Sequence, residues 1–134
     1  MTFFVQKYGG TSVGSTERIK QVAQRVANFQ AQGHALVVVV SAMSGETNRL
    51  ISLAKEIQPE PDAREFDVIL STGEQVSIAL LAMALHTLGV KAKSYTGLQA
   101  GITTDSAHNK ARILNIDEKP VSYTHLTLPT KRIV

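Results

Sequence analysis

The chain has 134 residues, of which 43% are apolar and only 5% aromatic, so we expect one soluble domain with an aliphatic interior. It contains no cysteine, which excludes a disulfide framework, a thiolate metal site and a cysteine nucleophile, and fits a cytoplasmic setting. The net charge is +3, but acidic and basic residues are interspersed and Lys131 and Arg132 supply two of the positive charges, so no nucleic-acid partner is expected.

The first predicted element is a short apolar strand, residues 2–7, which does not resemble a secretory signal. The turn after it contains Gly9, Gly10 and Gly14, which we expect to adopt backbone angles closed to other residues and to let amide N–H groups approach an anion. Lys7 can add a full positive charge at the same point. The turn predicts a phosphate site, but it has neither the P-loop nor the G-x-G-x-x-G spacing, and a glycine-rich connector with a solvated lysine explains it equally well.

A helix with Ser15 as its N-cap is predicted to run to a left-handed cap at Gly33. The unbroken run of Val and other apolar residues at 35–40 is typical of a strand buried on both faces of a parallel sheet. Strand, helix and strand form a βαβ unit, and ligands of such sheets bind beyond the carboxyl ends of the strands. Lys7 and Ser41 both fall at that edge, so we expect the two loops that follow these strands to share one crevice.

Three further helices are predicted. Residues 41–47 lead into a helix that ends before Pro59, and a second helix covers residues 62–70. The Ser-Thr-Gly sequence at 71–73 is expected to interrupt it before a third helix, residues 74–88, which is apolar around most of its circumference. This third helix is expected to be the core helix. Its longest apolar run is too short for a membrane span, which takes about twenty residues.

Short strands are predicted at residues 90–94 and 111–116. The last segment, residues 121–134, behaves differently, because its alternation of apolar and polar residues breaks at Leu126. Pro129 excludes a central strand, which leaves an edge strand or a loose tail. The histidines lack the spacing of metal ligands, so we expect no metal site made of protein side chains.

The segment KYGGTSVGSTERI closely resembles the opening of aspartate kinases of the amino acid kinase family. Later segments resemble the family in the same order, among them Ser-Ala at 41–42, Ser-Thr-Gly-Glu at 71–74 and the segment that begins at Ser94. The resemblance implies an α/β fold, a three-layer α/β/α sandwich with a mainly parallel central sheet, of which this chain holds only part. It also implies phosphorylation of the L-aspartate side-chain carboxylate by ATP, with Mg²⁺ bridging the phosphates, as the first step of lysine, threonine and methionine biosynthesis.

The resemblance assigns roles to particular residues. They are Lys7, Tyr8, Gly9 and Gly10 for ATP, and Ser41, Thr47 and Glu74 for L-aspartate. Lys7 would be the catalytic cation, and Glu74 would face the ammonium group of the substrate. From the residues alone, Ser41 and Thr47 could instead cap a helix, and Glu74 could satisfy the dipole of the helix that it opens.

We predict that residues 1–120 form the amino-terminal part of a kinase catalytic domain. Residues 121–134 resemble nothing in the family, and we interpret them as a truncated gene end or an artificial junction. The family's later Gly-Gly-Ser-Asp segment is not found, which puts the activity of the chain alone in doubt. We expect a homo-oligomeric parent with small-molecule partners only and no membrane. The alternatives are a family member with a different acceptor and a non-catalytic anion-binding fragment.

Overall fold

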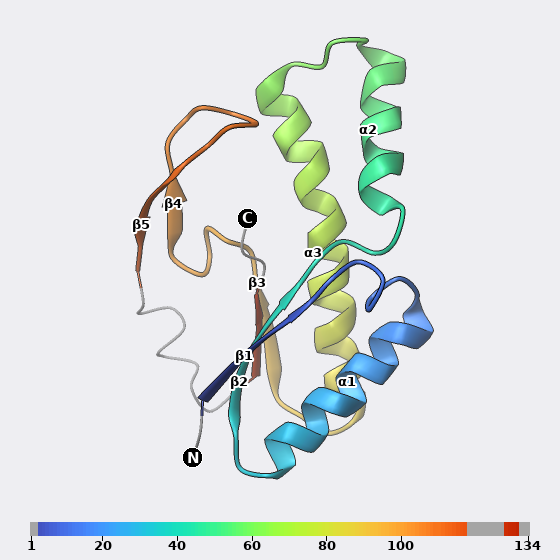
Figure 1. Cartoon of the computed structure of the whole chain (residues 1–134), viewed down its shortest axis with the longest axis vertical. Coiled ribbons are helices and arrows are strands. Elements are labelled where there is room, and N and C mark those ends of the chain that lie inside the picture. Colours follow the sequence, from blue (N-terminus) through green and yellow to red (C-terminus); the bar gives the residue numbers. More distant parts are fainter. Residues whose placement is uncertain (1–2, 118–127, 132–134) are drawn as a thin grey trace.

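The computed structural model describes residues 3–117 and 128–131, which form two sheets and three helices (Figure 1). Four parallel strands make one sheet in the order β1-β2-β6-β3, and β4 and β5 make a separate antiparallel pair. The elements are β1 (Phe3–Tyr8), α1 (Thr16–Ala31), β2 (Ala35–Val40), α2 (Glu46–Ile57), α3 (Ala63–Thr87), β3 (Ala92–Tyr95), β4 (Ile102–Thr104), β5 (Ile113–Ile116) and β6 (Leu128–Lys131). The α/β fold with a mainly parallel sheet is as predicted, although β3 and β5 each begin two residues later than expected.

The β1-α1-β2 unit is confirmed. The whole of β1 pairs with the whole of β2 in parallel register. The hydroxyl oxygen of Ser15 accepts a hydrogen bond from the backbone N–H of Arg18 at 3.2 Å, which satisfies one of the unpaired donors at the start of α1. Gly33 has φ +88°, the left-handed conformation expected just past the helix.

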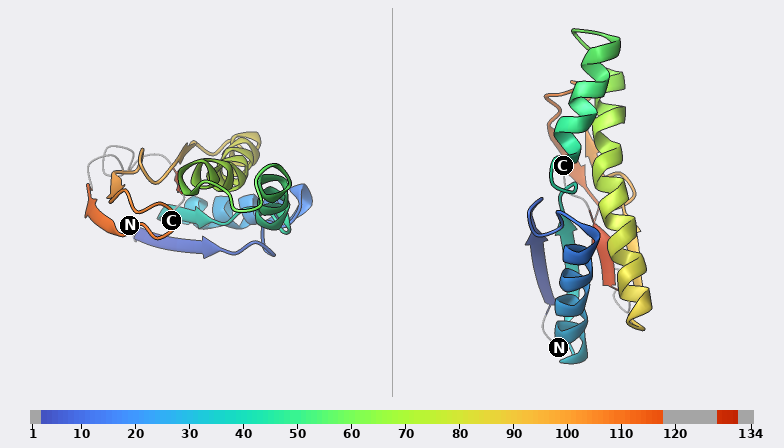
Figure 2. Two further views of the ribbon diagram at one scale, coloured as in Figure 1. Left: turned by 90° about the horizontal axis from the view of Figure 1, so that it is seen from above. Right: turned by 90° about the vertical axis from the view of Figure 1, so that its right-hand side faces the viewer.

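Helices α1 and α3 cover one face of the parallel sheet (Figure 2). Their apolar side chains and those of the strands form one core, which comprises Tyr8, Val13, Ile19, Val22, Ala23, Val26, Leu36, Val38, Val40, Ile78, Leu81, Leu85 and Val90. Because strand side chains alternate between faces, Phe3 and Val5 lie on the other face, where they are 57% and 63% exposed. The described residues therefore supply the sheet and one helical layer of the expected three-layer sandwich.

Helix α3 is one continuous helix of 25 residues, so the predicted interruption at 71–73 is wrong. The hydroxyl groups of Ser71 and Thr72 donate to backbone carbonyl oxygens three residues earlier, at 2.8 and 2.6 Å, and so are satisfied within the helix. Gly73 is buried, and a Cβ there would lie 3.2 Å from the Cβ of Ala42. The glycine lets α3 pack closely against the loop after β2. This packing outweighs the free-energy cost of about 1 kcal/mol that glycine carries inside a helix relative to alanine.

Judged by length and composition alone, α3 could cross a membrane. The helix packs against α1, α2 and β3, however, and Leu81 and Leu85 are fully buried. The core helix of a globular protein meets the same criterion. The carboxyl-terminal half of α3 therefore belongs to the core as predicted, but the prediction that it is buried on most sides is wrong, because Val76 and Met83 are 47% and 62% exposed.

The end of the chain departs from the prediction. Strand β6 lies between β2 and β3, so the prediction that Pro129 excludes a central strand is wrong. The register with β2 contains only Thr130 and Lys131, so the proline, which has no N–H to donate, pairs with β3 alone. Residues 118–127 and 132–134 lie outside the described residues, as do the predicted break at Leu126 and the proposed domain boundary near residue 120.

Candidate active site

The loops that follow β1 and β2 lie next to each other at the carboxyl ends of these strands (Figure 1). The backbone N–H of Ser41 donates to the carbonyl oxygen of Tyr8 at 3.1 Å. A Cβ on Gly10 would lie 3.3 Å from the carbonyl oxygen of Ala42, which is close contact between two backbones. The expectation that the two loops share one crevice is confirmed.

The glycines of the first turn act differently from the prediction. Gly9, Gly10 and Gly14 are not among the described residues with positive φ, so they do not use the left-handed conformation that favours glycine. Gly10 and Gly14 instead permit close approach, since a Cβ on Gly14 would lie 3.2 Å from the Cβ of Ser44. Gly9 has open space around its missing side chain. The turn needs two of its glycines for packing against the neighbouring loop.

A cavity of about 470 Å³ opens where these loops meet α2 and α3. It is lined by Gly10, Thr11, Ser41, Ala42, Met43, Ser44, Gly45, Thr47, Asn48 and Glu74. The lining is rich in hydroxyl and backbone groups and contains one carboxylate, from α3. Such a cavity suits a small polar ligand that carries both acidic and basic groups.

The first turn of α2 forms one wall of this cavity. Gly45 is the N-cap with φ +77°, and no side chain caps the helix. Thr47 lies inside the helix and is exposed, so the alternative that it caps α2 is wrong. The positive end of the α2 dipole and the hydroxyl group of Thr47 therefore lie at the same wall, an arrangement that favours an anionic ligand group.

Glu74 reaches the cavity from the middle of α3, so the prediction that it opens a helix is wrong. Satisfying a helix dipole therefore cannot explain this carboxylate. The preceding Gly73 brings α3 close enough to α2 that a Cβ there would lie 3.3 Å from Cδ1 of Leu50. This close packing brings the half-buried Glu74 into the same cavity as Ser41 and Thr47.

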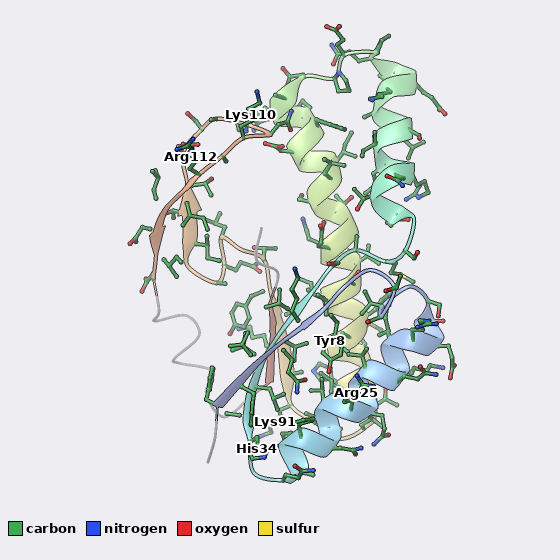
Figure 3. The ribbon with its side chains drawn as sticks, viewed as in Figure 1. Tyr8, Arg25, His34, Lys91, Lys110 and Arg112 are labelled. Carbon is green, nitrogen blue, oxygen red and sulfur yellow. The ribbon has the colours of Figure 1, made fainter. Side chains whose placement is uncertain are left out.

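The other predicted residues lie apart from this cavity. Tyr8 is only 8% exposed, its ring belongs to the core between the sheet and the helices, and its hydroxyl group donates to Oε1 of Gln6 at 2.9 Å (Figure 3). Lys7 is exposed and, by strand alternation, lies on the opposite face from Tyr8. Neither residue lines the cavity, and Gly9 does not line it either. The structure thus brings together Gly10 and the predicted aspartate-binding residues.

Several residues of the cavity were missed from the sequence. Thr11, Ser44 and Asn48 carry hydroxyl or amide groups to the lining, and only their position beside predicted residues could have indicated this. Next to the cavity, Arg49 donates to Glu46 from one turn away, with a shortest distance of 2.6 Å. This hydrogen bond lowers the pKa of Glu46 below its ordinary value and raises that of Arg49.

The fold and cavity together define a class of protein. A parallel sheet, two loops that meet at the carboxyl ends of adjacent strands and a helix N-terminus beside them are typical of α/β proteins that bind small anionic ligands. The described residues contain no group of three His, Cys, Asp or Glu side chains that could hold a metal ion. Any metal used at this site would therefore need further ligands.

The chain belongs to the amino acid kinase family, whose family model matches residues 2–124. It is 64% identical to an aspartate kinase of Pseudomonas putida over 121 residues, which are 90% of this chain and 29% of that protein. It is 61% identical to an aspartokinase of Geobacillus stearothermophilus over 117 residues, again 29% of the relative. The chain thus spans about three tenths of the length of these relatives.

Solved structures agree with this assignment. An aspartate kinase from Synechocystis superimposes with a TM-score of 0.86 at 42% identity, over 98% of this chain and 22% of that one. Aspartokinase III of E. coli, solved with aspartate and ADP, gives a TM-score of 0.73 at 18% identity, over 98% of this chain and 40% of the other. At that identity the second match shows a shared fold alone.

Proposed function

We propose that this chain is the amino-terminal part of an aspartate kinase, which transfers the γ-phosphoryl group of ATP to the side-chain carboxylate of L-aspartate. The products are ADP and 4-phospho-L-aspartate, the first intermediate expected for lysine, threonine and methionine biosynthesis. The observation that carries the proposal is the 64% identity to an aspartate kinase over 90% of the chain. The cavity at the ends of β1 and β2 supplies a chemically suitable site.

The acceptor, L-aspartate, carries two carboxylates and one ammonium group, and the cavity offers a partner for each kind of charge. We assign a substrate carboxylate to the N-terminal turn of α2, where the hydroxyl groups of Ser41 and Thr47 can donate hydrogen bonds. We assign the ammonium group to Glu74, the one carboxylate in the lining. These opposite charges on two walls would fix the orientation of the substrate.

The donor, ATP, is assigned to the β1-α1 turn. Phosphoryl transfer needs cations and N–H donors around the migrating group more than it needs covalent chemistry. The exposed Lys7 can supply the charge, and the amides of Gly9 and Gly10 can supply donors. Because the ring of Tyr8 is buried in the core, we limit its part to its backbone. The described residues contain no group of three His, Cys, Asp or Glu side chains that could hold a metal ion, so Mg²⁺ would be held mainly by the ATP phosphates and water.

A coupled assay of ADP release tests the proposal. It is run on this chain and on a full-length kinase in which these residues are continued by the part found in the relatives. We expect ADP release that depends on L-aspartate in the full-length kinase. Release with another carboxylate, carbamate or phosphate acceptor, and none with L-aspartate, would indicate a different member of the family. ATP binding without turnover on any acceptor would indicate a non-catalytic anion-binding protein, and either result would refute the proposal.

A further inference from the structure

The tip of the β4-β5 hairpin is hydrogen-bonded to α3 through the carboxylate of Asp67. The backbone N–H of Asn109 donates to both carboxylate oxygens, at 3.2 and 3.1 Å, and Nδ1 of His108 lies 3.1 Å from Oδ2. These contacts join residues 41 and 42 positions apart in the chain. Figure 1 shows the hairpin reaching α3 near the start of that helix, and Figure 3 labels Lys110 and Arg112 in this part of the hairpin.

The tip of the hairpin is also held together by hydrogen bonds of its own. Oδ1 of Asp105 accepts hydrogen bonds from the backbone N–H groups of Ala107 and Arg112, at 3.0 and 3.3 Å. The backbone N–H of Asp105 donates to the carbonyl oxygen of Arg112 at 3.1 Å, which closes the loop. Asn109 has φ +65°, the left-handed conformation that directs its N–H toward α3 and that asparagine tolerates.

The attachment lies on the face of α3 that carries the proposed substrate ligand. Asp67, Ser71 and Glu74 are spaced by four and three residues, so they follow one another along one side of the helix. Two helical turns separate Asp67 from Glu74, about 10 Å along the helix axis. The hairpin and this side of α3 border a second, open cavity of about 630 Å³, whose lining includes Asp67, Leu70, Ser71, Thr104 and Asn109.

We propose that Asp67 is a positioning residue for the acceptor side of the kinase site, an inference that rests on the proposed function. It holds the hairpin tip against the side of α3 that carries Glu74 two turns further on, and so fixes the position of this part of the helix. Without this attachment the tip loses its hydrogen-bonded contact with α3, and the stretch of the helix that positions Glu74 loses its support from the hairpin. Binding of L-aspartate weakens, whereas ATP, assigned to the β1-α1 turn, binds as before.

Steady-state kinetics of the full-length kinase carrying Asp67→Asn test this role. The substitution keeps the shape of the side chain but removes the charge and one of the two accepting oxygens. We expect the KM for L-aspartate to rise about fivefold or more, as for the loss of hydrogen bonds to a charged acceptor, with kcat and the KM for ATP within about twofold of the unaltered enzyme. A merely structural defect would lower the active fraction and leave both KM values unchanged.

Two further variants serve as controls. Glu65→Gln removes the same charge from the same helix, at an exposed side chain that contacts Arg64, and should leave both KM values unchanged. Asn109→Gly keeps the donating N–H and the positive φ, so it should retain the KM for L-aspartate. Amide hydrogen exchange of residue 109 should accelerate in Asp67→Asn and stay slow in Glu65→Gln.

The kinetic results distinguish failure of the positioning role from failure of the proposed function. An unchanged KM for L-aspartate in Asp67→Asn, in a kinase that turns over L-aspartate, would overturn the positioning role and leave the proposed function intact. An equal rise in the KM for ATP would overturn it too, because the effect would not be confined to the acceptor. An unaltered enzyme without aspartate-dependent turnover would overturn the proposed function and the positioning role with it.

Discussion

Replacing Leu81 with aspartate should prevent the chain from folding. Leu81 lies in the carboxyl-terminal half of α3 with no exposed surface and belongs to the core between the sheet and the helices. Losing the burial of a leucine side chain costs about 1.5–3 kcal/mol, and a carboxylate without a partner in an apolar core costs several kcal/mol more. The sum approaches the total stability of a small domain, about 5–15 kcal/mol.

The assay compares the soluble yield and the thermal unfolding of Leu81→Asp with those of Met83→Asp. Met83 lies two residues further along the same helix but is 62% exposed, so the same new charge there meets water and should change stability by about 0.5 kcal/mol or less. We expect Met83→Asp to unfold at nearly the original temperature and Leu81→Asp to show no cooperative transition. A normal melting transition for Leu81→Asp would refute the assignment of α3 as the core helix.

Three further predictions concern the site and its surroundings. Lys7→Ala in the full-length kinase should lower kcat about 100-fold or more, and an unchanged kcat would exclude the role of Lys7 in the transition state. Gly10→Ala should unfold at a lower temperature than Gly9→Ala, because only the former adds a Cβ within 3.3 Å of a backbone oxygen; equal melting temperatures would contradict this packing. The pKa of Glu46 is lowered by the hydrogen bond from Arg49, so the stabilisation from this pair is present at neutral pH and lost as the pH falls through the lowered pKa. NMR titration should therefore show a higher pKa for Glu46 in Arg49→Gln, and the same pKa in both proteins would argue against the bond.

The βαβ unit could be predicted from the sequence because its signals are local. The apolar run in β2, the serine before α1 and the glycine after it act within a few residues of each other, and the structure confirms all three. The shared crevice followed from topology, since adjacent parallel strands end at the same edge of the sheet.

The course of α3 could not be predicted, because the deciding contact is tertiary. Glycine, serine and threonine in succession favour a break when only propensity is considered. In the structure Gly73 packs against Ala42 and Leu50, and this contact holds the helix continuous through the glycine. The position of Glu74 within the helix follows from the same contact. The attachment of Asn109 to Asp67 has no short-range signal at all.

One error was avoidable. Lys7 and Tyr8 are neighbours in a strand, and neighbouring strand residues point to opposite faces of a sheet. Assigning the side chains of both residues to ATP conflicted with that alternation. The burial of Tyr8 among α1 and α3 residues is its structural consequence.

The central claim is that the cavity between the β1 and β2 loops binds L-aspartate, with Glu74 opposite the ammonium group. The most direct test is the KM for L-aspartate of the full-length kinase carrying Glu74→Gln, which keeps the size of the side chain and removes its charge. Loss of a charged hydrogen-bond partner predicts a rise of about tenfold or more, with the KM for ATP unchanged. An unaltered KM for L-aspartate would contradict the claim and move the acceptor site away from this cavity.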